Sequence, residues 1–154
     1  MGVKVALRLD PAQQETVLAE LDALAPLVLE PRARGGYAEL RRAVEGGEVA
    51  PDAVGRLESL VALSLETGRA RRVHGAEGEQ ALRRLFQQTP RGSAALAAAA
   101  AVNQGLQTLA GQVLEGMLFT VQGPGIYKLG IRTDRCSLTI EIDRDGVSAE
   151  TLEV

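Results

Sequence analysis

Apolar and polar residues follow one another with two different periods along this chain. Residues 3–9 alternate between apolar and polar or small side chains, which predicts a short half-buried strand. Asp10 and Pro11 then suit the N-cap and the first position of a helix, and Gln13 completes a capping box. Apolar residues recur at three- and four-residue steps after this start, so we expect a helix that ends at Pro26.

Helical patterns and connectors alternate over the next sixty residues. Residues 26–36 are rich in Pro, Gly and Arg, which predicts a connector. Helices are expected at 37–45 and 51–67, because glycines follow both segments. Apolar residues lie nearly all round the second of these helices, so we expect it to be central. Residues 69–75 are interpreted as a basic loop, and a further helix follows up to Thr89.

Residues 93–113 predict a long, alanine-rich helix. Its larger apolar residues fall at three- and four-residue steps and form one seam: Leu96, Ala99, Val102, Leu106, Leu109 and Val113. Two glycines within this segment, Gly105 and Gly111, weaken a helix, so we expect another part of the chain to lie close to the backbone there.

The period changes to two after Leu114. Apolar residues alternate over 117–121, 127–131 and 136–142, and Asp145-Gly146 predicts a tight turn before a last strand. These segments predict an antiparallel meander with one apolar face. We expect the preceding helix to cover that face, with Leu106 at the centre of the contact.

The predicted fold class is therefore α+β. An N-terminal helical region, which can include a short first strand, precedes a long helix packed on a three- to four-stranded antiparallel β-meander. Residues 1–90 are expected to form the helical lobe and residues 91–154 the helix-plus-meander lobe, although one continuous domain also fits the pattern. A chain of 154 residues suits either arrangement.

Composition narrows the classes of function. The formal net charge of −3 and the aromatic content of 3% argue against a protein that binds nucleic acid over its whole surface. A single cysteine and a start without a signal-peptide pattern favour a soluble, cytoplasmic protein. The uncharged stretch 92–114 carries several amide side chains, which are costly in lipid, so we expect no membrane insertion.

Residues that carry catalytic or metal chemistry are sparse. His74 is the only histidine, which removes two-histidine metal sites, and no Gly-x-Ser-x-Gly elbow supplies a nucleophile. Glu77 or Glu79 could orient the His74 imidazole, but we favour a solvated loop at this position. Cys136 lies on the apolar face of its strand, so we expect a buried, unreactive thiol. We expect no catalytic residue, no metal and no cofactor.

The most suggestive charged feature is a basic cluster on and beyond the loop at 69–75. A positive surface of this kind could meet a protein partner or nucleic acid. The alternative is a solvated helical face. We take the following residues as candidate partner-binding residues: Arg69, Arg71, Arg72, His74, Arg83 and Arg84.

The opening of the chain, Lys4 to Pro11 followed by a leucine-rich helix, resembles the ribbon–helix–helix family of DNA-binding proteins. The resemblance implies that the first strand pairs with its counterpart across a dimer. Lys4, Ala6 and Arg8 would then face the major groove, and residues 37–45 would form the second helix. The connector between the two helices is longer than in that family.

Three hypotheses of function follow. The first is a non-enzymatic interaction protein, an accessory or regulatory subunit of a larger protein assembly that also self-associates, for example as a homodimer. The second is a dimeric ribbon–helix–helix-type DNA-binding regulator with a C-terminal effector unit. The third is a small-molecule binder or enzyme that uses a cleft between helix and sheet near His74 or Tyr127.

Overall fold

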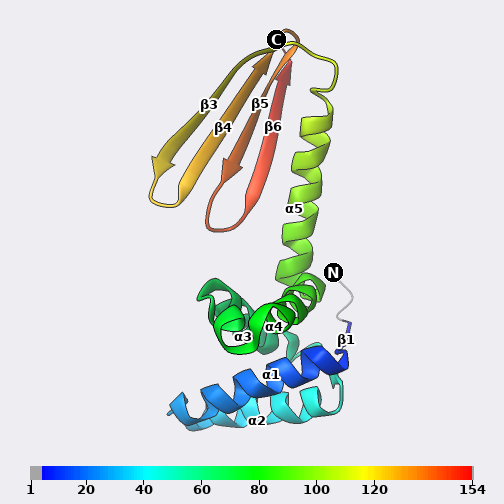
Figure 1. The fold of residues 1–154 in the computed structure, drawn as a ribbon, viewed down its shortest axis with the longest axis vertical. Coiled ribbons are helices and arrows are strands. Elements are labelled where there is room, and N and C mark those ends of the chain that lie inside the picture. The colour runs from blue at the N-terminus through cyan, green and yellow to red at the C-terminus, as the bar shows by residue number, and fades with distance from the viewer. Residues whose placement is uncertain (1–4, 154) are drawn as a thin grey trace. The chain divides into compact units, whose positions relative to one another are not determined.

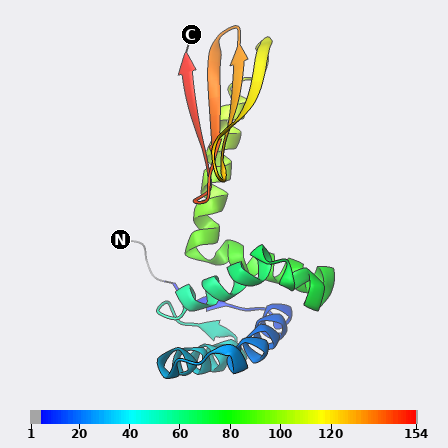
Figure 2. The same ribbon diagram turned by 90° about the vertical axis from the view of Figure 1, so that its left-hand side faces the viewer.

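A computed structural model describes residues 5–153 of the chain. Helices come first and a four-stranded antiparallel sheet comes last, which confirms the predicted α+β class (Figures 1 and 2). The chain divides into two compact units, Met1–Gly92 and Ser93–Val154. The boundary falls in the first turn of helix α5 (Pro90–Gln107).

The first unit is a small helical assembly with one short two-stranded sheet. Its elements are β1 (Leu7–Arg8), α1 (Pro11–Leu24), the 3-10 turn η1 (Ala25–Leu27), α2 (Pro31–Glu45), β2 (Glu48–Val49), α3 (Val54–Glu66) and α4 (Arg69–Gln88). Strands β1 and β2 pair antiparallel. The fully buried side chains come from every helix of the unit and include Val17, Leu40, Val44, Leu57, Val61, Leu82 and Leu85.

Helix α1 begins as the sequence predicts. The Asp10 carboxylate accepts a hydrogen bond from the Gln13 amide N–H at 2.8 Å, and the Gln13 side chain accepts one from the Asp10 N–H at 2.9 Å. Pro11 occupies the first helical position, where its missing N–H would have had no partner in the helix. The predicted capping box is therefore confirmed.

The connector predicted before residue 37 is wrong in its second half, because α2 already begins at Pro31. Glu30 caps this helix by accepting a hydrogen bond from the Ala33 N–H at 2.9 Å. Gly36 is buried inside the helix, and a Cβ at this position would lie 2.3 Å from Cζ of Arg56. The glycine thus makes room for a neighbouring guanidinium and does not stop the helix.

The basic loop predicted at 69–75 is also wrong, because these residues form the beginning of α4. Gly68, in the left-handed region with a φ of 70°, ends the preceding segment, and Arg69 begins the helix. Gly75, with a φ of 69°, then kinks α4 without ending it. Glycine adopts such angles without a steric penalty, so both positions suit it.

The second unit consists of most of α5 and a meander of four strands. These are β3 (Leu114–Gly123), β4 (Ile126–Thr133), β5 (Cys136–Ile142) and β6 (Val147–Glu153), in the spatial order β3-β4-β5-β6 (Figure 1). Helix α5 ends at Gln107, earlier than predicted. Gly111 lies in the turn that follows, with a φ of 75°. A Cβ at this position would have no neighbour within 4 Å in the described part of the chain, so the close approach expected there is not found.

The stripe that faces the sheet shares only Val102 and Leu109 with the predicted seam. In this unit Ala98, Val102 and Gly105 are the least exposed residues of α5, and Leu109 follows just after the helix. A Cβ on Gly105 would lie 3.1 Å from Cδ1 of Leu138, which confirms the close approach expected there. Leu106 is 38% exposed, so its predicted place at the centre of the contact is wrong.

Candidate interaction surfaces

Two of the predicted partner-binding residues turn inward and bind a buried carboxylate. Glu20 on α1 is only 4% exposed. Its carboxylate oxygens accept hydrogen bonds from Nε of Arg69 at 3.0 and 3.2 Å, and one of them lies 2.5 Å from Nε2 of His74. Arg69 and His74 therefore hold the first part of α4 against α1, and Glu20 is their common partner.

Glu20 was missed in the sequence, although its position carries a signal. Glu20 lies between Val17 and Leu21 on the apolar stripe of α1, where an acidic residue is rarely buried unless it has a partner. Beside the cluster is a hollow of about 230 Å³ whose lining includes Leu24, Leu60 and Ser64. The buried hydroxyl of Ser64 has no hydrogen-bond partner among the described residues.

Two further candidate residues, Arg71 and Arg83, both pair with Glu79 on the same helix. The hydrogen bond from Arg83 contributes most to holding the pKa of the Glu79 carboxyl below its ordinary value. The positive charges of Arg83 and Arg71 and the hydrogen bond from Arg71 lower this pKa further. Arg72 and Arg84 are exposed, and neither forms an ion pair within residues 5–153. The predicted basic cluster thus keeps two uncompensated charges in the described part of the chain.

The residues expected to read DNA in the ribbon–helix–helix hypothesis come from β1. Lys4 lies outside the described residues. Ala6 is partly buried, and Arg8 is exposed with Nε 3.6 Å from a carboxylate oxygen of Glu48. Strand β1 pairs with β2 of its own chain through Leu7 and Arg8. The resemblance implies that β1 pairs with its counterpart across a dimer. In the described part of the chain β1 pairs with β2 of the same chain instead.

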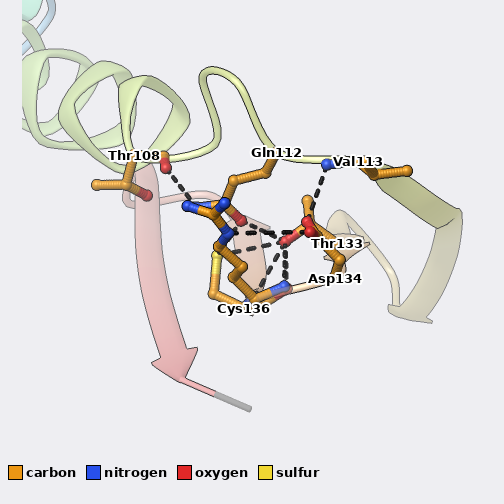
Figure 3. A network of polar contacts seen from close by, with 7 residues as sticks. Thr108, Gln112, Val113, Thr133, Asp134 and Cys136 are labelled. Carbon is orange, nitrogen blue, oxygen red and sulfur yellow. Dashed lines mark hydrogen bonds and ion pairs between the residues drawn. The ribbon is translucent and has the colours of Figure 1, made fainter.

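Cys136 belongs to a polar network at the end of the sheet (Figure 3). Its thiol is buried and donates to Oε1 of Gln112 at 3.3 Å, and the Thr133 hydroxyl donates to the same oxygen at 2.5 Å. The Gln112 amide donates in turn to the Thr108 carbonyl at 2.7 Å. The predicted burial of the thiol is confirmed. The network fastens the segment after α5 to the turn between β4 and β5.

The apolar face of the sheet is covered over only part of its width. Cross-strand pairs place three residues of β3 beside residues of β4 on this face. The pairs are Met117 with Ile131, Phe119 with Leu129 and Val121 with Tyr127. Packing with α5, chiefly with Val102, buries the side of this face that contains Ile131, Leu138 and Ile140.

The rest of the face, along β3 and at the paired ends of β4 and β5, remains exposed. Its five large apolar residues, which we call the open half, are between 37% and 68% exposed: Met117, Phe119, Val121, Tyr127 and Ile142. The rings of Phe119 and Tyr127 stack with their centroids 5.7 Å apart. In Figure 1, β3 is the strand farthest from α5. An apolar surface of this kind, formed by adjacent side chains on a regular sheet, is typical of an interaction site.

Strand β3 is also an edge of the sheet with little protection. It is 10 residues long, and its one charged residue, Glu115, is paired with Arg132 at 3.3 Å. Edge strands in proteins usually carry charges, prolines or bulges that discourage pairing with other chains. Register shifts occur only at the two ends of β3, beside Gly116 and Gly123. The edge between them is therefore regular and uncharged.

Residues 5–153 contain neither a group of side chains that could hold a metal ion nor a helix that could cross a membrane. No three His, Cys, Asp or Glu side chains in this range lie together in a group that could hold a metal ion. None of the helices there combines the length and apolar character needed to cross a membrane. The sequence matches no protein-family model, no curated protein and no solved structure at a significant level.

Proposed function

We propose that this chain is a non-enzymatic interaction protein, an accessory subunit of a larger assembly, and that the open half of the sheet is the surface through which it docks. The observation that carries this proposal is the exposure of Met117, Phe119 and Val121 on the apolar face. Leaving such side chains in water forgoes about 1.5–3 kcal/mol for each one that a partner could bury. A docked protein recovers that free energy.

The surroundings of His74 and Cys136, the one histidine and the one cysteine of the sequence, support a non-enzymatic role. The His74 ring is held by a buried carboxylate, and the Cys136 thiol is buried and donates to a glutamine. A general base or a thiol nucleophile needs access to a substrate, which these surroundings restrict. Both side chains stabilise contacts between elements of their own unit.

The test compares two lysine substitutions on adjacent residues of β3. Phe119→Lys places a charge on the open half, whereas Leu118→Lys places the same charge on the opposite face of the same strand, where Leu118 is 67% exposed. Each full-length variant replaces the wild-type protein in its own cell, and complexes are captured by chemical cross-linking.

We expect wild type and Leu118→Lys to yield the same cross-linked complex and Phe119→Lys to lose it, with all three chains folded by circular dichroism. A complex that survives Phe119→Lys unchanged would exclude the open half as the docking surface.

A further inference from the structure

The apolar face of the sheet is wider than the one helix that covers it. Four strands about 4.8 Å apart make a sheet roughly 19 Å wide, and a helix with its side chains is about 10 Å across. One helix therefore cannot cover all four strands. Helix α5 packs against Leu138 and Ile140 of β5, Val147 of β6 and Ile131 of β4, which leaves β3 without cover, together with the ends of β4 and β5 at Tyr127 and Ile142. The uncovered strip runs along a strand of 10 residues, so a second helix could lie along it.

The same unit carries a helical surface that lacks a partner. Helix α5 contains no charged residue from Gly92 to Gln107. Leu96, Ala99, Asn103 and Leu106 recur at three- and four-residue steps on a flank away from the sheet-facing stripe. Leu96 is 51% exposed and Leu106 38%. A helix that is apolar on several sides is normally buried on several sides.

We propose that the occupant of the open half is the α5 helix of a second copy of this chain. In a two-fold symmetric dimer, each copy lays the flank with Leu96 and Leu106 on the open half of its partner. This inference rests on the proposed function, since it names the protein that the open half docks. The packing repeats the chemistry of the covered half, where uncharged α5 residues already lie on apolar strand residues.

The exposed area of the open half and of the helix flank matches the area that each chain buries in a stable dimer. The five side chains of the open half are 37–68% exposed, so each leaves on the order of 100 Å² in water. The helix flank adds roughly 200–300 Å², and because the symmetry repeats the contact, each chain contributes both surfaces. The sum of roughly 700–800 Å² per chain agrees with the approximately 800 Å² that each partner contributes in a standard interface. The one charged residue of β3, Glu115, already pairs with Arg132, so this strand brings no unpaired charge into the contact.

Two complementary charges test this arrangement in the full chain by sedimentation velocity. Phe119→Lys alters the sheet side and Leu96→Glu the helix side, and each homodimer would then bury two unpaired charges. In a mixture, one of the two contacts pairs the lysine with the glutamate and the other is wild type. We expect wild type to be a dimer, each variant alone to be a monomer, and the equimolar mixture to recover a dimer. Gln104→Glu, exposed on another flank of α5, is the matched control and should remain a dimer.

Any other pattern overturns the inference. A monomeric wild type shows that a second copy is not the occupant, and a mixture that stays monomeric shows that the helix of a second copy does not lie on the open half. Recovery of a dimer also proves that both variants are folded. If wild type is monomeric but Phe119→Lys still loses its complex in the cell, the docking function stands with a different protein as the partner.

Discussion

Glu20 is the residue whose surroundings are most informative, because a carboxylate with 4% exposure needs partners. Arg69 and His74 supply them from α4, although 49 and 54 positions separate these residues from Glu20 in the sequence. Arg69 and His74 were expected to be docking residues because their neighbours in the sequence do not reveal a partner this far away. An acidic residue on an apolar helical stripe was the available sign.

Replacement of Glu20 by Gln should therefore destabilise the protein. The amide keeps the shape of the side chain but leaves the Arg69 charge without its counter-charge, and we expect a loss of about 1–3 kcal/mol in the free energy of unfolding. Urea unfolding followed by circular dichroism measures it. Glu77→Gln, at an exposed position of α4, is the control and should change stability by less than about 0.5 kcal/mol. Equal stability of the two variants would contradict a structural role for Glu20.

Glu79 gives a prediction that depends on pH. Because its pKa in the fold lies below the ordinary value of 4.5, chiefly through the hydrogen bond from Arg83, folding favours its ionised form. Its stabilising contribution is complete above the unfolded pKa and is lost as the pH falls through the folded pKa. Wild type should thus be more stable than Glu79→Gln near neutral pH, and the difference should vanish in strongly acidic buffer. Urea unfolding at the two pH values measures it, and a difference that grows on acidification would contradict the assignment.

At the scale of elements, boundaries were predicted well where a cap or a change of period marks them. The capping box at Asp10 and the alternation after Leu114 are of this kind, and both are confirmed. The start of α2 was missed because the Pro, Gly and Arg content of residues 26–36 predicts a connector, whereas Gly36 is a helical residue that packs against Arg56. The orientation of α5 was missed because a run of alanines gives almost no apolar contrast between the sides of a helix.

The orientation of α5 can be tested by moving one aspartate around the helix. Val102 is 9% exposed against Leu138 and Ile140, so Val102→Asp buries an unpaired charge and should cost several kcal/mol. Leu106→Asp places the same charge on a flank that is 38% exposed and should leave the fold of the single chain intact. Circular dichroism during thermal unfolding, at low protein concentration, measures both. The reverse order would mean that Leu106 lies at the centre of the contact, as the sequence predicts.

At the scale of the whole molecule, the α+β class and the meander follow from the sequence, because periods of 3.6 and 2 are local properties of the chain. The open half does not follow from it. Phe119 and Ile140 alternate in the same way along their strands, yet Phe119 is 58% exposed and Ile140 is 6% exposed. The difference arises from which strands the single helix reaches, and that depends on the width of the sheet and on the contact at Gly105.

The central claim is that the open half is covered when the protein works, and hydroxyl-radical footprinting in the cell tests it most directly. Met117 lies on the open half and is 59% exposed in the single chain, while Leu118, its neighbour on the opposite face, is 67% exposed. Oxidation of both is measured by mass spectrometry in cells and in dilute purified protein. We expect Met117 to be protected in cells and Leu118 to be oxidised to the same extent in both settings. Equal oxidation of Met117 in the cell and in dilute solution would contradict it.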